Sequence, residues 1–205
     1  MMFSKLSGKY VSVEGVIGVG KTTLVQTLSR KYTMPTVLEV VEENPFLVRF
    51  YEDMERWAFQ TQLFFLISRF DQQSNVKKAA SQGQGVVSDY AFIKDHLFAS
   101  LNLKGEQLRL YEKIFNALKE QVLHPDLIVY LYADVDTLMN RIALRDRPFE
   151  RRMDRTYISM LSDAYENYMK DVAESQVLRI DTSNIDFVRN PEDLKRVFER
   201  IEAIL

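Results

Sequence analysis

The 205-residue sequence contains no cysteine and two histidines, and its formal net charge is −2. The absence of cysteine excludes disulfide bonds, thiolate catalysis, zinc fingers and iron–sulfur ligation. The two histidines, His96 and His124, are too few for a multi-histidine metal site, and neither has a catalytic role visible in the sequence. A net charge of −2 gives no basic footprint for duplex DNA, so we expect no nucleic-acid partner.

Long apolar runs are also missing from this sequence. No stretch of about 18 apolar residues occurs, which excludes a membrane-spanning helix and predicts no membrane partner. The first residues lack the apolar core of a secretory signal, so we expect a cytoplasmic protein. With 46% hydrophobic and 27% charged residues, the chain is typical of a soluble globular domain, and we expect one domain over residues 1–205.

Short apolar runs alternate with longer helical patterns along the chain. The expected strands are Tyr10–Glu14, Thr36–Val41, Gly85–Ser88, Leu127–Ala133 and Val177–Asp181. The expected helices are Lys21–Tyr32, Met54–Ala80, Gly105–Val122, Val135–Arg145, Arg155–Glu174 and Pro191–Leu205. This alternation predicts an α/β domain, a parallel sheet flanked by helices.

Residues 15–22, GVIGVGKT, fit the pattern G-x-x-x-x-G-K-[ST] and lie between an expected strand and an expected helix. In that context the pattern indicates a phosphate-binding loop, in which backbone N–H groups and a lysine surround phosphate oxygens. We therefore expect a nucleoside triphosphate with Mg²⁺, and the alternative is a glycine-rich turn without a ligand. The expected contacts are Gly15, Gly18, Gly20, Lys21, Thr22 and Thr23.

Three further segments carry a family resemblance. They read LEVVEENPFLVRFYEDMERWAFQTQLFFLISRF, VVSDYAFIKDHLFA and NRIALRDRPFERR. In these segments the sequence resembles the deoxyribonucleoside kinases, most of all the bacterial deoxyadenosine and deoxyguanosine kinases, from about Tyr10 to Phe187. The resemblance implies a P-loop kinase fold with a five-stranded parallel sheet. It also implies transfer of the γ-phosphate of ATP to the 5′-hydroxyl of a deoxynucleoside, with purines preferred and deoxycytidine possible.

Glu39 stands where such kinases carry the glutamate of an E-P-V motif, although the proline is missing here. A carboxylate at the end of a strand, facing the P-loop, is well placed to accept the proton of an attacking hydroxyl. Glu42 or Glu43 is an alternative base, because all three lie within five residues.

Asp89 resembles the acidic residue of the family's D/E-R motif. It is expected to coordinate Mg²⁺ together with Thr22, or to share the role of base with Glu39. The arginine that the family carries next in the chain is Tyr90 here.

The long helix expected at Met54–Ala80 places Gln62, Phe65, Leu66 and Arg69 on one face. By resemblance Gln62 reads the base, Tyr51 contacts the sugar 3′-hydroxyl, and Arg69 pairs with an acid beyond the base. That acid is Asp95 when counted from Asp89, whereas counting back from Phe98 puts Lys94 at this position. Trp57 is expected either to line the same pocket or to pack structurally.

Arg141, Arg145 and Arg147 match the family's R-x-x-x-R-x-R lid, which spans about residues 145–152. Converging guanidinium groups would stabilise charge on the transferred phosphoryl group, and the alternative is a solvated charged face. By resemblance Glu150 contacts the 3′-hydroxyl, and the loop containing Asp186 and Phe187 packs on the adenine of ATP.

The resemblance also implies a homodimer. The apolar face of Gly105–Val122 is a candidate surface for it, and the alternative is that this face belongs to the core. Two other functions remain open. A nucleoside monophosphate kinase such as thymidylate kinase would share the P-loop and the lid, and a non-catalytic nucleotide-binding protein would share the scaffold.

Overall fold

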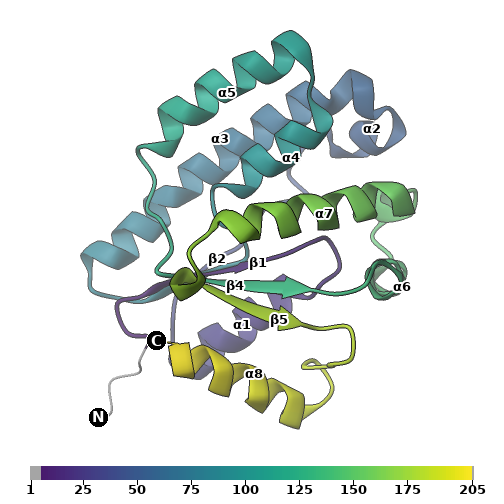
Figure 1. Cartoon of the computed structure of the whole chain (residues 1–205). Coiled ribbons are helices and arrows are strands. Elements are labelled where there is room, and N and C mark those ends of the chain that lie inside the picture. The colour runs from purple at the N-terminus through teal and green to yellow at the C-terminus, as the bar shows by residue number, and fades with distance from the viewer. Residues whose placement is uncertain (1–5, 205) are drawn as a thin grey trace.

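Five parallel strands form one sheet in the order β2-β3-β1-β4-β5 (Figure 1). Their bounds in this computed structural model, which describes residues 6–204, are β1 (Tyr10–Glu14), β2 (Thr36–Val37), β3 (Val86–Ser88), β4 (Leu127–Tyr132) and β5 (Val177–Asp181). Every residue of β1 and β3 is buried, as expected for strands covered on both faces. In the central register Val11 lies between Val87 and Leu127.

Helices cover both faces of the sheet. Their bounds are α1 (Lys21–Tyr32), α2 (Leu47–Glu52), α3 (Met54–Ser81), α4 (Lys94–Asn102), α5 (Gly105–Lys119), α6 (Val135–Arg145), α7 (Arg155–Asp171) and α8 (Pro191–Ile204). Figure 1 shows α1 and α8 on one face and α3, α4 and α7 on the other, with α5 packed outside α3 and α4. No helix within residues 6–204 combines the length and the apolar composition needed to cross a membrane.

The expected second strand is wrong in its length. Strand β2 ends at Val37, whereas Leu38, Glu39 and Val41 leave the sheet and line a cavity. The C-terminal part of the expected strand therefore forms a cavity wall. The prediction was too long because a cavity wall and a buried strand contain the same apolar residue types.

Other element boundaries also differ from the sequence expectation. Two short helices, α2 and α4, were not expected, because runs of six and nine residues give little helical periodicity. Helix α5 ends at Lys119, and α7 ends at Asp171, after which the chain forms a short 3₁₀ helix, η2 (Glu174–Gln176). The expected lid contains a second 3₁₀ helix, η1 (Pro148–Glu150).

The strand order places the first βα loop at the centre of the sheet. Strand β1 lies where the chain turns from one half of the sheet to the other, and in such sheets ligands bind in the crevice outside the carboxyl ends of the strands. Gly15 begins this loop with φ +141°, and a Cβ atom there would lie 2.1 Å from the carbonyl oxygen of Leu131. Glycine is therefore required at this position for the loop to pass close to β4.

Candidate active site

The loop of residues 15–20 connects β1 to α1, whose first residue is Lys21. The Lys21 ammonium group donates hydrogen bonds to the carbonyl oxygens of Gly15 (2.8 Å) and Val16 (3.0 Å), so it lies inside the arc of the loop. Burial and the nearby Lys94 lower the pKa of Lys21 to about 8, although Glu39 and other carboxylates oppose the shift. A bound phosphate would relieve this cost by pairing with the ammonium.

Two cavities meet at this loop. The first has a volume of about 280 Å³ and the second a volume of about 790 Å³. The residues that line both are Gly18, Lys21, Thr22, Arg145 and Arg147. A ligand in one cavity and a ligand in the other would therefore meet beside the Lys21 ammonium.

The second cavity contains most of the residues predicted to hold a nucleoside triphosphate. Besides the shared residues, its wall includes Gly20, Thr23, Arg141, Asp186 and Phe187. Gly15 is not on this wall. The guanidinium of Arg141 donates to the carbonyl oxygen (2.6 Å) and the hydroxyl (3.0 Å) of Thr182, which fixes it against the segment after β5.

Phe187 lies directly beside the phosphate-binding loop. Gly20 has φ +107°, and a Cβ atom there would lie 2.9 Å from the Phe187 ring. Glycine is therefore required at position 20 for two reasons: its backbone is left-handed, and a Cβ atom would collide with the Phe187 ring.

The first cavity contains the residues predicted to hold the phosphate acceptor. Its wall includes Glu39, Tyr51, Gln62, Arg69, Asp89, Lys94 and Glu150, contributed by α2, α3, α4, η1 and the segments that follow β2 and β3. Asp95 does not line this wall. It is fully buried behind Arg69, to which it is ion-paired.

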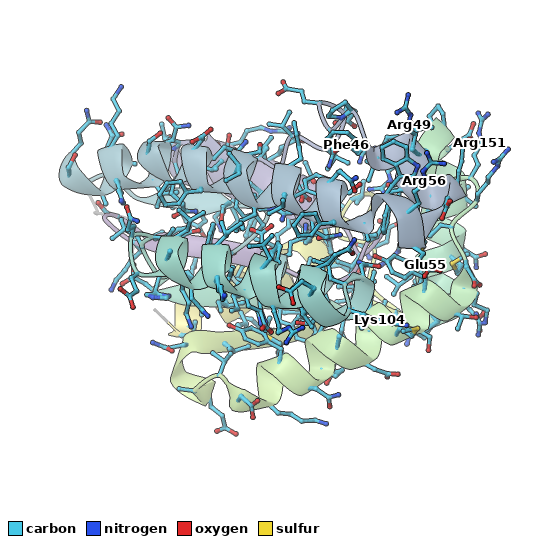
Figure 2. All side chains as sticks on the ribbon, turned by 90° about the horizontal axis from the view of Figure 1, so that it is seen from above. Phe46, Arg49, Glu55, Arg56, Lys104 and Arg151 are labelled. Carbon is cyan, nitrogen blue, oxygen red and sulfur yellow. The ribbon has the colours of Figure 1, made fainter. Side chains whose placement is uncertain are left out.

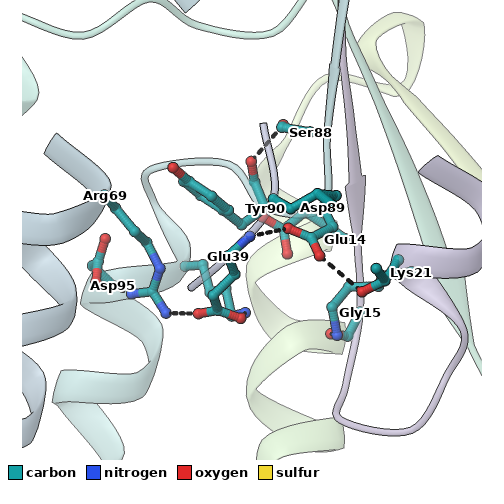
Figure 3. A network of polar contacts seen from close by, with 12 residues as sticks. Glu14, Gly15, Lys21, Glu39, Arg69, Ser88, Asp89, Tyr90 and Asp95 are labelled. Carbon is teal, nitrogen blue, oxygen red and sulfur yellow. Dashed lines mark hydrogen bonds and ion pairs between the residues drawn. The ribbon is translucent and has the colours of Figure 1, made fainter. Parts of the chain in front are cut away.

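Glu39 lies at the centre of a buried charge network (Figure 3). One carboxylate oxygen accepts from the Arg69 guanidinium, and the other accepts from the Lys94 ammonium at 2.6 Å. Burial alone would raise the pKa of Glu39, but the charges of Lys94 and Arg69 outweigh it and hold the pKa well below its usual range. Glu39 is therefore ionised at neutral pH.

Glu42 and Glu43, the alternative bases, are exposed, whereas Glu39 lines the cavity. Glu42 forms an ion pair of 3.2 Å with Arg147. This geometry favours Glu39 over the two later carboxylates as the group that meets an acceptor hydroxyl.

Asp89 joins Glu39 to the phosphate-binding loop, and Figure 3 shows it between them. Its Oδ1 atom accepts from the backbone N–H of Glu39 (2.7 Å), and its Oδ2 atom accepts from the Thr22 hydroxyl (2.8 Å). Residues 6–204 hold no group of three or more acidic or histidine side chains arranged for a metal. One carboxylate and one hydroxyl nevertheless fit Mg²⁺, which is commonly bound through one or two carboxylates, substrate phosphates and water.

The expected lid residues Arg145 and Glu150 form a two-point ion pair. Arg145 Nη2 lies 2.6 Å from each Glu150 oxygen, and Nε lies 3.1 Å from Oε2. Tyr51 lies beside η1, where its ring stacks on that of Phe149 with a centroid separation of 6.4 Å. The structure thus brings Tyr51 and Glu150 to the same part of the first cavity.

Trp57 packs structurally and does not line either cavity. Its ring stacks on Phe46 with a centroid separation of 6.1 Å, and the guanidinium carbons of Arg49 and Arg56 lie 4.9 and 5.4 Å from its ring centre. Figure 2 shows Phe46, Arg49 and Arg56 together at the end of the molecule where α3 begins.

Sequence reasoning treated Lys94 and Asp95 as alternatives for one position, but both point inward. They are adjacent in α4, and each contacts a different partner: Lys94 pairs with Glu39 and Asp95 with Arg69.

Glu14 was not identified from the sequence as a residue of the site. It is a fully buried carboxylate at the end of β1 that accepts hydrogen bonds from the Ala91 N–H and, at 3.1 Å, the Tyr165 hydroxyl. A charged residue closing an apolar strand before a P-loop was the signal available for it.

Comparisons with known proteins agree with this site. A model of the deoxynucleoside kinase family matches residues 11–205. The chain is 36% identical to a deoxyguanosine kinase of Bacillus subtilis (strain 168), covering 96% of this chain and 97% of that protein. It is 32% identical to a deoxyadenosine/deoxycytidine kinase of the same organism, covering 95% and 92%. A solved structure of a deoxyadenosine kinase from M. mycoides with dCMP and dCDP superposes with a TM-score of 0.83 at 22% identity, covering 95% of this chain and 99% of that one.

These matches extend over nearly the whole chain, and the P-loop, the sheet order and the arginine-bearing segment after α6 agree with the fold of a P-loop kinase. The expected family and fold class are therefore confirmed. This chain belongs to the deoxynucleoside kinase family.

Proposed function

We propose that this kinase uses ATP with Mg²⁺ to phosphorylate the 5′-hydroxyl of a purine deoxynucleoside, with deoxycytidine as a weaker acceptor. The observation that carries this proposal is the junction of the two cavities, where the same lysine and arginine side chains line both walls. The larger cavity takes the triphosphate, and the smaller one takes the nucleoside.

The triphosphate is held by the backbone N–H groups of the P-loop and by cationic side chains. Lys21, Arg145 and Arg147 stand where the two cavities meet, so their charges act on the phosphoryl group that is transferred. Thr22 and Asp89 would hold Mg²⁺, which when bound neutralises charge on the phosphate oxygens. Phe187 offers an apolar face for the adenine ring.

Glu39 acts as the general base. Its carboxylate accepts the proton of the nucleoside 5′-hydroxyl while that oxygen bonds to the γ-phosphorus, and the bond from this phosphorus to the bridging oxygen breaks to release ADP. A carboxylate with a low pKa suits this step, because phosphoryl transfer passes through a loose transition state in which the attacking oxygen needs little prior deprotonation.

Gln62 and Arg69 are the groups that read the base. Both line the smaller cavity, and two of their buried polar atoms, Gln62 Oε1 and Arg69 Nε, have no hydrogen-bond partner within residues 6–204. The exocyclic amine of adenine suits the free acceptor, and the carbonyl oxygen of guanine suits the free donor. Thymine would present its methyl group to the Arg69–Asp95 pair, with a penalty on the order of 1–3 kcal/mol for each polar group left unsatisfied.

Tyr51 and Glu150 are proposed to hold the sugar 3′-hydroxyl. Both line the smaller cavity, and Glu150 is anchored by Arg145. A carboxylate and a phenol together provide an acceptor and a donor for a hydroxyl.

The charges of the smaller cavity favour a neutral nucleoside over a nucleoside monophosphate as the acceptor. Arg69, Lys94, Arg145 and Arg147 each have a carboxylate partner. An acceptor phosphate would have to compete with these carboxylates, whereas a hydroxyl would not.

Transfer from γ-labelled ATP to the four deoxynucleosides and to their 5′-monophosphates tests this function. We expect labelled 5′-monophosphates from deoxynucleosides, no labelled diphosphates, and no product with Lys21→Ala, whose fold is expected to persist because the lysine acts on phosphate charge. Transfer to the monophosphates instead would assign the thymidylate-kinase type of activity, and no transfer to either would assign a non-catalytic protein.

A homodimer is also proposed, with α5 contributing to the interface. The structure limits the surface available, because Tyr111 and Phe115 of the expected face belong to the core, while Leu110 on α5 and Ile67 on α3 are exposed. Light scattering is expected to give about twice the chain mass, and a monomer at assay concentration would contradict the proposal.

A further inference from the structure

Position 90 contributes no side chain to either cavity. Tyr90, which stands where related kinases carry an arginine, is fully buried, and its hydroxyl donates to Gln72 of α3. The cation expected beside Glu39 from the family pattern is therefore not supplied from this position.

Lys94, four residues further along, supplies a cation at the smaller cavity. Its side chain is 4% exposed, it lines the cavity together with Lys21 and Glu39, and its ammonium lies 2.6 Å from Glu39 Oε2. Burying a lysine costs free energy unless its charge is paired. The ion pair with Glu39 offsets that cost for Lys94.

Lys94 and Arg69 use different oxygens of Glu39. Arg69 occupies Oε1 and also pairs with Asp95, so its charge is shared between two carboxylates. Lys94 occupies Oε2, and each carboxylate oxygen has two lone pairs, so Oε2 can accept from both Lys94 and an acceptor hydroxyl.

We propose that Lys94 is the positioning residue that orients the Glu39 carboxylate for phosphoryl transfer, in place of the arginine absent at position 90. This inference rests on the proposed function, in which Glu39 takes the proton of the 5′-hydroxyl. Lys94 acts through Glu39: its ion pair fixes the plane of the carboxylate while the O5′–phosphorus bond forms and ADP leaves.

The test compares Lys94→Met, Lys94→Arg and the control Lys104→Met, which removes a lysine from an exposed position at the start of α5. With deoxyguanosine as the acceptor, we expect Lys94→Met to lower kcat about 100-fold, within the range of general base catalysis, and to change KM less than about threefold. Lys94→Arg should recover most of the loss in kcat, and Lys104→Met should match the unaltered enzyme.

A double variant separates this inference from the assignment of the base. If Lys94 acts through Glu39, adding Lys94→Met to Glu39→Gln costs less than about threefold in kcat beyond Glu39→Gln alone, because coupled residues are not additive. A kcat of Lys94→Met within about threefold of the unaltered enzyme, or a full additional loss in the double variant, overturns the inference. Normal turnover of Glu39→Gln would instead overturn the proposed base.

Should Lys94→Met lack a cooperative thermal transition, Lys94→Gln is measured in its place, because it keeps a hydrogen-bond donor for Glu39 without the charge. We expect a fall in kcat of at least about tenfold with KM changed less than about threefold, because the ion pair with Glu39 is lost. A kcat within about threefold of the unaltered enzyme again overturns the inference.

Discussion

The backbone N–H of Glu39 donates a hydrogen bond of 2.7 Å to Asp89 Oδ1. The other carboxylate oxygen of Asp89, Oδ2, accepts a hydrogen bond from the hydroxyl of Thr22, the residue after the P-loop lysine. Asp89 thus couples the position of Glu39 to the phosphate-binding loop. The proposed base and the phosphate-binding loop are therefore held in register by the one side chain that follows β3.

Asp89→Asn is expected to separate the two contacts. The amide oxygen can still accept from the Glu39 N–H, so the fold should persist, but the charge offered to Mg²⁺ is lost. We expect a higher Mg²⁺ concentration for half-maximal rate and a thermal unfolding midpoint within a few degrees of the unaltered protein. A Mg²⁺ titration identical to that of the unaltered enzyme would show that Asp89 is not a metal ligand.

The pKa of Lys21, lowered to about 8 by burial and by Lys94, predicts a pH-dependent affinity for ATP. Bound phosphate favours the ammonium form, so binding takes up protons near pH 8 and weakens as the pH rises. Between pH 7 and pH 9 the dissociation constant for Mg²⁺–ATP should increase by up to about tenfold. Calorimetry measures both the affinity and the proton uptake. Lys21→Arg should remove the dependence, because arginine stays charged, and a dependence retained in that variant would exclude Lys21 as its source.

Glu39→Gln should lower turnover by about 10²–10⁴-fold while the KM for the nucleoside changes far less, since a positioned base acts in the transition state. Glu42→Gln and Glu43→Gln are matched controls, because both residues are exposed and lie outside the cavity. Steady-state kinetics of the three variants decides the assignment. A larger loss of turnover in either control would identify a different base.

Tyr51→Phe should weaken recognition of the sugar 3′-hydroxyl. Loss of one hydrogen bond of about 0.5–1.5 kcal/mol corresponds to a fall in kcat/KM of about two- to tenfold for deoxyguanosine. The matched acceptor is 2′,3′-dideoxyguanosine, which lacks this hydroxyl and should be phosphorylated equally by both proteins. An equal loss with both acceptors would show that the phenol acts on packing.

The sequence was informative where short motifs carry chemistry and less so where tertiary packing decides. The P-loop and Arg141, Arg145 and Arg147 could be placed because their spacing is set by local geometry at helix ends. The position of Lys94 could not be predicted, because α4 is short. Its first two residues are both charged and buried, and each pairs with a different partner. Periodicity assigns one face of a helix to the core, and it does not anticipate an ion-pair network that buries two adjacent charges.

Asp95 illustrates a second limit of the sequence. Its pairing with Arg69 was expected, whereas its place behind Arg69, away from the cavity wall, was not. Its effect on the acceptor would therefore be transmitted by Arg69. Burial raises the pKa of Asp95 to about 6, although Arg69 opposes the shift.

The preference among acceptors tests the account most directly, because it depends on Gln62 and Arg69 at the cavity wall and on Asp95 behind Arg69. The measurement is kcat/KM of the unaltered enzyme for the four deoxynucleosides at saturating Mg²⁺–ATP. The account predicts the highest values for deoxyguanosine and deoxyadenosine, a lower value for deoxycytidine and the lowest for thymidine. A higher kcat/KM for thymidine than for either purine deoxynucleoside would contradict it.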